Sequence, residues 1–264
     1  MLGKLLKYEF KSTSRTLLPC YGALVIISIF TRLLAVGDNS MIRSDSFAMQ
    51  IAAGISITLF VALMIAVFVL TFLVIVQRFY KNLFGEEGYL SNTLPVKPWM
   101  HITSKSIVAL VWSIVSGIVA LFACSVLFLF NGVFTEFLRA FPEFFQRMLQ
   151  YINLNTVAFF IEIVVLCLIG FILSLWLIYA AISLGQMAHK NRLLCSFAWF
   201  LGLNTALEIV VSIIARFTPQ MIFQPQGFNG LHGSFWYLIA LETLFAAALF
   251  AITNHMMTKK LNLE

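Results

Sequence analysis

Six long apolar runs, separated by short polar connections, set the strongest limit on how this 264-residue chain can fold. They cover residues 17–36, 50–76, 102–130, 156–184, 193–215 and 235–257. A helix needs about 20 apolar residues to cross the roughly 30 Å of hydrocarbon in a bilayer. Because 61% of the residues are hydrophobic and 11% are charged, a soluble domain is excluded. The sequence therefore predicts an all-α integral membrane protein whose six transmembrane helices form a single domain over residues 1–264.

The distribution of basic residues predicts how the chain is oriented. Cytoplasmic connections of membrane proteins are enriched in lysine and arginine. Of the 17 lysine and arginine residues, twelve lie at the two termini and around residues 78–105 and 190–192. We therefore expect both termini and the connection after the second span to face the cytoplasm. The net charge of +6 then reflects topology, and no nucleic-acid partner is expected.

Two segments outside the spans have amphipathic patterns. Residues 1–16 place Lys4, Lys7, Lys11 and Arg15 at helical spacing, which predicts a helix lying at the membrane interface. Residues 131–155 alternate aromatic and charged positions every three or four residues, and we expect an outer amphipathic helix, bent or restarted near Pro142. This second helix lies on the outer leaflet, or it forms a lid over the mouth of the bundle.

Small residues at four-residue spacing recur in the third and fourth predicted spans and allow neighbouring helices to approach closely, which supports a bundle without specifying its arrangement. The pairs are Ser113 with Gly117, Ala120 with Cys124, Gly170 with Ser174 and Ala181 with Gly185. The outer connection 216–233 holds two prolines and three glycines, so we expect irregular turns there.

The polar connection at residues 77–101 is the most informative stretch outside the membrane. Its centre, GEEGYLSNTL, predicts a short helix whose two acidic residues complement the positive end of the helix dipole. Pro95 and Pro98 end this helix, because proline lacks an amide donor, and Pro98 can open the next long helix. The short helix would be held rigidly between two membrane helices.

Three glutamates, Glu162, Glu208 and Glu242, interrupt the last three spans. Counted from the outer ends of the predicted spans, all three lie about 9–12 Å deep. Carboxylates at that depth must be paired, protonated or exposed to a wet cavity. They form either an acidic ring on a translocation path or structural pairs with Arg32 and Arg216, and breaking such pairs could gate the bundle.

Patterns typical of enzymes and metal sites are absent from the sequence. There is no phosphate-binding GxxxxGK[ST] loop, no HExxH and no GxSxG, and the four cysteines lie in apolar runs without CxxC spacing. We therefore expect no catalytic residue, no metal site and no cofactor in this chain. If ATP drives its function, a partner chain binds the ATP and Mg²⁺ and hydrolyses the nucleotide.

The chain resembles the ABC-2 type permeases of Gram-positive bacteria. The residues that carry the resemblance are LLKYEFK at 5–11, RFYKNL at 78–83, EEGYL at 86–90, TLPV at 93–96 and SK at 104–105. The resemblance extends over essentially the whole chain, since the number of spans and the position of the cytoplasmic connection also agree. One departure is the amphipathic segment after the third span, because related polysaccharide and lipid exporters carry re-entrant helices between the last two spans.

The resemblance implies a permease subunit whose coupling helix, residues 84–95, docks into a separate ABC ATPase subunit. The docking residues would be Phe84, Gly85, Glu86, Glu87, Gly88, Tyr89, Leu90, Leu94 and Pro95. It also implies a second permease copy or a related permease, and a substrate among peptides, lantibiotics, lipids and drugs. The alternative is a secondary transporter or channel that uses the intramembrane glutamates. Such a protein is expected to contain internal repeats, and this sequence shows no convincing repeat.

Overall fold

The computed structural model describes residues 2–35, 47–85, 88, 96–128, 136, 139–143, 146, 154–188, 191–218 and 227–259. These residues form six long helices that are apolar enough to cross a membrane, so the predicted multi-pass helical architecture is confirmed. The helices are α1 (Leu2–Ala35), α2 (Phe47–Phe84), α4 (Pro98–Phe128), α6 (Leu154–Gly185), α7 (Arg192–Phe217) and α9 (Gly227–Lys259).

Helix α1 joins the predicted interfacial segment and the first predicted span in one helix. It is continuous from Leu2 to Ala35 and includes Pro19. The apolar side of its first turns meets protein, since Leu6 and Phe10 pack against the cluster that contains Trp112. Residues 2–16 thus form the first part of this continuous helix.

The connection between α2 and α4 is shorter than predicted: it covers residues 85–97 and not residues 77–101. Helix α2 continues for two turns beyond Val76, because Ile75, Phe79 and Leu83 at four-residue spacing keep one buried apolar face. Helix α4 begins at Pro98, as predicted, where the missing amide donor carries no penalty.

The chain divides into two compact units, and both α2 and α4 contribute to each of them. Unit 1 comprises residues 1–77 and 107–150, and unit 2 comprises residues 78–106 and 151–264.

The core of unit 1 contains apolar side chains from α1, α2 and α4, among them Leu17, Phe60 and Trp112. A buried hydroxyl of Ser116 on α4 lies 2.6 Å from the Tyr21 hydroxyl of α1 and 2.9 Å from the Thr71 hydroxyl of α2. Hydrogen bonds of this kind hold membrane helices together where lipid offers the side chains no partner.

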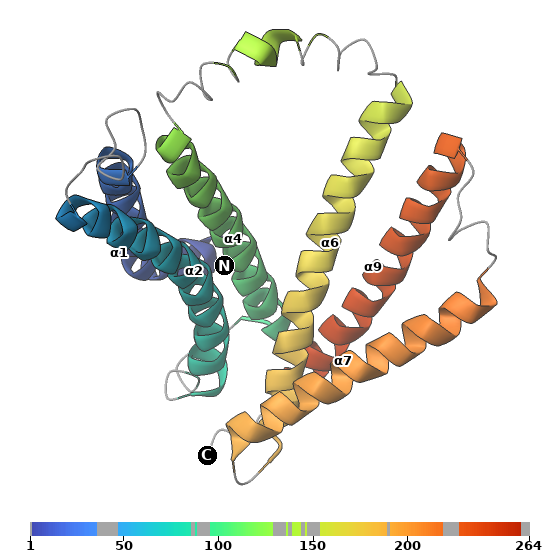
Figure 1. Cartoon of the computed structure of the whole chain (residues 1–264). Helices are drawn as coiled ribbons and strands as arrows, with labels where there is room; N and C mark the ends of the chain where they lie inside the picture. Colours follow the sequence, from blue (N-terminus) through green and yellow to red (C-terminus); the bar gives the residue numbers. More distant parts are fainter. Residues whose placement is uncertain are drawn as a thin grey trace. The chain divides into compact units, whose positions relative to one another are not determined.

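Unit 2 is built around α6, which packs along α9 and against α7 (Figure 1). Leu177 and Ala180 of α6 and Leu249 of α9 form a buried cluster, against which Leu203 and Leu207 of α7 pack. The contacts advance in the same direction along both α6 and α9, so these two helices run parallel.

The turn between α6 and α7 brings two backbones into contact. A Cβ added at Gly185 would lie 2.6 Å from the backbone N and Cα of Ser196 and would also overlap its hydroxyl. Gly185 is therefore a position at which a small residue allows the close approach of α6 and α7. Asn191 precedes α7 in the left-handed conformation, with φ 55° and ψ 49°, which asparagine tolerates better than most residues do.

Two predicted connections have different outcomes. Irregular turns were expected over residues 216–233, but Arg216 lies inside α7 and α9 already begins at Gly227. In this added part of α9 the His232 side chain contacts Glu162 of α6, and residues 219–226 of the expected connection lie outside the described residues. Within the predicted outer helix at 131–155, residues 139–143 are helical and exposed, with Pro142 inside the helical turn, and most of the other positions lie outside the described residues.

Candidate functional site

The two helix ends that flank residues 85–97 are anchored to α6. The ring of Phe79, near the end of α2, stacks on the ring of Tyr179 in α6, with centroids 3.7 Å apart and planes 3° from parallel. Both side chains are almost completely buried. An aromatic pair contributes beyond its buried area, so this stack fixes the end of α2 against the middle helix of unit 2.

Polar contacts add to this anchor. The ammonium group of Lys105, a buried residue of α4, donates to the backbone carbonyl of Arg78 in α2 at 3.3 Å. One residue later, the hydroxyl of Ser106 accepts a hydrogen bond of 2.9 Å from the indole nitrogen of Trp176 in α6. We call the set of Arg78, Phe79, Lys105, Ser106, Trp176 and Tyr179 the inner block.

The predicted docking residues begin directly after the inner block. The ring of Phe84 lies 5.9 Å from that of Phe79, and the amides of Gly85 and Gly88 donate to the carbonyls of Tyr80 and Gly85 at 3.1 and 2.8 Å. A Cβ at Gly85 would lie 2.8 Å from the Lys81 carbonyl oxygen, so glycine allows this tight end of α2. The remaining docking positions, Glu86, Glu87, Tyr89, Leu90, Leu94 and Pro95, lie outside the described residues.

Glu162 in α6 is paired with a histidine for which no sequence motif predicted a role. Its Oε2 lies 2.8 Å from Nδ1 of His232 in α9, and the side chains are 7% and 20% exposed. The Phe159 and Phe235 rings pack edge to face beside this pair, at 5.2 Å. The contact joins residues 70 positions apart and ties the first turns of α9 to α6.

Glu242 lies deeper along the same helix pair. A Cβ at Gly170 would lie 3.4 Å from Oε2 of Glu242, at ordinary contact distance, so Gly170 of α6 lies directly against this carboxylate. Oε2 is buried and, among the described residues, has no hydrogen-bond partner. Gly170 follows Glu162 by eight residues, or about 12 Å along α6, so Glu162 and Glu242 do not share the single level that the sequence indicated.

Glu208 lies on a part of α7 that the rest of unit 2 leaves exposed. Its Oε1 accepts a hydrogen bond of 2.9 Å from the amide of Asn204, one turn earlier. Among the described residues, none of the three glutamates forms an ion pair with the exposed Arg216, so a pairing of this arginine stays a prediction. Arg32 belongs to unit 1, where it is half-buried near the end of α1.

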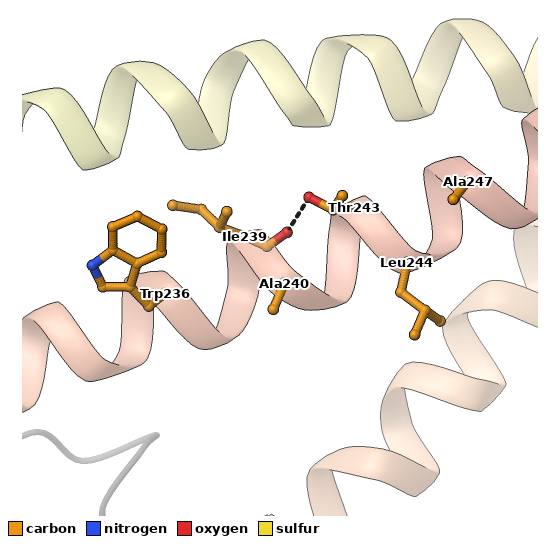
Figure 2. A pocket seen from close by; sticks show the side chains of 6 residues that line it. All are labelled: Trp236, Ile239, Ala240, Thr243, Leu244 and Ala247. Carbon is orange, nitrogen blue, oxygen red and sulfur yellow. Dashed lines mark hydrogen bonds between the residues drawn. The ribbon is translucent and has the colours of Figure 1, made fainter.

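An open hollow runs along α9, and Figure 2 shows the six residues that line it: Trp236, Ile239, Ala240, Thr243, Leu244 and Ala247. The one hydroxyl in this lining, that of Thr243, donates to the Ile239 carbonyl at 2.6 Å and is thereby satisfied. The surface of the hollow is consequently apolar, which suits a lipid chain or the hydrophobic part of a ligand.

Among the described residues, no group of three or more histidine, cysteine or carboxylate side chains could hold a metal ion. The inner block could have been found in part from sequence, since the buried spacing of Ile75, Phe79 and Leu83 continues the apolar face of α2. No local signal identified Tyr179 or His232, because their partners come from distant parts of the chain.

The chain was compared with protein-family models, with curated proteins and with solved structures, and none of the three comparisons found a match.

Proposed function

We propose that this chain is the permease subunit of an ABC-2 type transporter, which moves a hydrophobic or amphipathic substrate using ATP hydrolysed by a separate subunit. Residues 84–95 would dock into that ATPase from the cytoplasmic side of the plasma membrane. A second permease copy or a related chain would complete the membrane part. The bound ATP and Mg²⁺ belong to the partner, since this chain has no phosphate-binding loop.

The inner block is the observation that carries this proposal. The helices on both sides of residues 85–97 are held against α6. The end of α2 is held by the Phe79–Tyr179 stack, and the beginning of α4 by the hydrogen bond between Ser106 and Trp176. A docked subunit that moves residues 85–97 therefore acts on α6 directly, in addition to α2 and α4. A flexible connection would absorb such a movement instead of passing it on.

Helix α6 continues from the inner block to the intramembrane glutamates. Tyr179 and Glu162 are 17 residues apart, or about 25 Å along the helix, and Gly170 lies between them opposite Glu242. Movement of α6 along α9 would change the surroundings of both carboxylates and of the apolar hollow. A substrate with an apolar body and a cationic group fits these features better than a small polar solute does.

Charge reversal in the docking segment tests the proposal. The tagged chain is purified from its native membranes in mild detergent, and the co-purified proteins are searched for an ATPase with a phosphate loop. We expect such an ATPase in stoichiometric amount with the unaltered chain, and its loss with Glu86→Lys combined with Glu87→Lys. Leu94→Ala should leave the complex intact or weaken it, and should reduce the coupling of ATP hydrolysis to transport in proteoliposomes.

The matched control is Glu143→Lys, which makes the same charge reversal at an exposed position of the predicted outer segment. It should leave both complex formation and coupled transport unchanged. If the variants at Glu86, Glu87 and Leu94 all assemble and transport like the unaltered chain, the docking proposal is wrong.

A secondary transporter or channel is the second candidate. The observation that favours it is the buried Oε2 atom of Glu242, which has no hydrogen-bond partner in the part of the chain that the structure describes. Intramembrane carboxylates commonly mark ion and proton pathways. Substrate uptake or ion flux by the purified chain in liposomes, without nucleotide and without any ATPase, would support this candidate. Dependence of transport on both the ATPase and ATP would exclude it.

A further inference from the structure

The first turns of α1 carry four cations on one side of the helix. Lys4, Lys7, Lys11 and Arg15 lie within about 80° of the helix circumference, and all four are exposed. Glu9 is the only acidic residue of α1, and it lies about 120° or more away from each of them. In the part of the chain that the structure describes, none of the four cationic groups forms an ion pair or a hydrogen bond. We call this side of α1 the basic face.

The other side of these turns is packed against protein. Leu6, Phe10 and Leu17 belong to the apolar core of unit 1, and the Phe10 ring lies 6.5 Å from that of Trp112 in α4. The centres of the packed side and of the basic face are about 130° apart. An ordinary interfacial helix inserts its apolar side into lipid, but here that side is occupied by α2 and α4. The basic face is therefore the part of these turns that remains available to the membrane.

The position of the basic face along α1 places it beside the lipid headgroups. The apolar part of the helix begins at Leu17, two residues after Arg15. Lys11 lies one turn before Arg15, or about 6 Å along the axis, and the headgroup layer on each side of the hydrocarbon is about 5–8 Å thick. Lys7 and Lys4 follow at about 12 and 16 Å from Arg15, within about one Debye length of the headgroups at physiological ionic strength.

Unit 2 is a poor partner for the basic face, because its own charge has the same sign. The parts of unit 2 that are expected on the same side of the membrane are residues 78–106, 186–192 and 259–264. They contain eight lysine and arginine residues and three glutamates. Anionic phospholipids are the complementary neighbours, and clusters of about four or more cations next to a membrane helix are typical of binding to such lipids.

We propose that the basic face of α1 binds the phosphate groups of anionic phospholipids in the surrounding membrane. A zwitterionic headgroup balances its phosphate with a cation of its own, so the basic face selects lipids that carry a net negative charge. The inference goes beyond the proposed function and does not depend on it. The experiment therefore uses neither nucleotide nor ATPase.

Lipid titration followed by native mass spectrometry tests the proposal with the full chain in detergent micelles. Dissociation constants are measured for phosphatidylglycerol and for phosphatidylcholine, and their ratio gives the preference for the anionic headgroup. The variant combines Lys7→Gln, Lys11→Gln and Arg15→Gln, because glutamine keeps a high helix propensity. We expect the unaltered chain to prefer phosphatidylglycerol and the variant to lose about 5- to 25-fold of that preference, or about fivefold for each cation that reaches a headgroup.

Two controls separate this contact from a general effect of charge. Exchanging the cations as Lys7→Arg, Lys11→Arg and Arg15→Lys keeps the charge and should keep the preference. Lys81→Gln, Lys97→Gln and Lys259→Gln remove the same three charges from exposed positions on α2, directly before α4 and on α9, which share no helix face. This second control should reduce the preference less than the variant in α1 does. Tryptophan emission should be the same for all of these chains, since the packed side of α1 is unaltered.

Three results would overturn the inference. The first is an unaltered chain that binds phosphatidylglycerol and phosphatidylcholine equally. The second is an equal loss of preference in the α1 variant and in the control at positions 81, 97 and 259, which would leave net charge as the cause. The third is an unchanged preference in the α1 variant together with loss of a protein that co-purifies with the unaltered chain, which would assign the basic face to an acidic protein partner.

Discussion

Replacing Gly185 with alanine tests the close contact between α6 and α7. The new Cβ would lie 2.6 Å from the backbone of Ser196, whereas ordinary van der Waals contact begins at 3.4 Å. The two backbones must therefore separate by about 0.8 Å or more, because no flexible side chain can move aside. Overpacking of this kind costs about 1–3 kcal/mol, and the roughly 1 kcal/mol by which alanine favours a helix interior is small at a terminal residue.

Gly170→Ala, on the same helix, is the matched control. Its Cβ would lie 3.4 Å from the Oε2 atom of Glu242, at the end of a flexible side chain. We expect this variant to be as stable as the unaltered protein, or more stable by up to about 1 kcal/mol from helix propensity.

The assay is reversible unfolding in mixed micelles of increasing SDS content, followed by tryptophan fluorescence. The free energy of unfolding should fall by about 1–3 kcal/mol for Gly185→Ala and should hold or rise for Gly170→Ala. An unchanged free energy for Gly185→Ala, or a larger loss for Gly170→Ala, would refute the assignment of a backbone contact between Gly185 and Ser196.

Three further predictions concern individual contacts of unit 2, measured in the same unfolding assay. Phe79→Ala and Tyr179→Ala should each lower the free energy of unfolding by about 3–5 kcal/mol, and their double-mutant cycle should give a coupling energy of about 0.5–1.5 kcal/mol. A coupling energy of zero would contradict the stacking of these two rings. His232→Ala should destabilise the protein by about 1–3 kcal/mol, because it leaves the buried Glu162 without its donor, and His232→Gln should cost less. Asn191→Ala should lower the free energy of unfolding by about 1 kcal/mol, because alanine is disfavoured in the left-handed conformation, whereas Asn191→Gly should leave it unchanged. Equal effects of the two substitutions would contradict the left-handed conformation of this residue.

The spans were predictable because long apolar runs have few alternatives to crossing a membrane, but the ends of the helices were not. Beyond Val76, the polar residues Arg78, Lys81 and Asn82 gave α2 the composition of a loop, although Phe79 and Leu83 continued its buried face. Periodicity was the better guide there, since one buried side is enough to extend a helix into water.

The outer site was less predictable because its contacts join distant residues. Depths counted from the expected start of the last span placed Glu242 level with Glu162, and the earlier start of α9 at Gly227 changes that count. His232 lies in a stretch rich in glycine and was expected in a loop, so its pairing with Glu162 had no local signal. The close packing at Gly185 was foreseen because a small residue allows close approach whichever helix lies opposite.

Pro19 indicates how far into the membrane each part of α1 lies. A proline within a helix has no amide hydrogen for the carbonyl four residues earlier, which in α1 is that of Arg15. Hydrocarbon cannot hydrate such a carbonyl, so we expect Arg15 to lie where water and headgroups reach it. Ala35 follows Arg15 by 20 residues, a rise of about 30 Å along the helix, which matches the hydrocarbon thickness. The first turns of α1 would then extend past the hydrocarbon into the headgroups or the cytoplasm, while remaining part of one continuous helix.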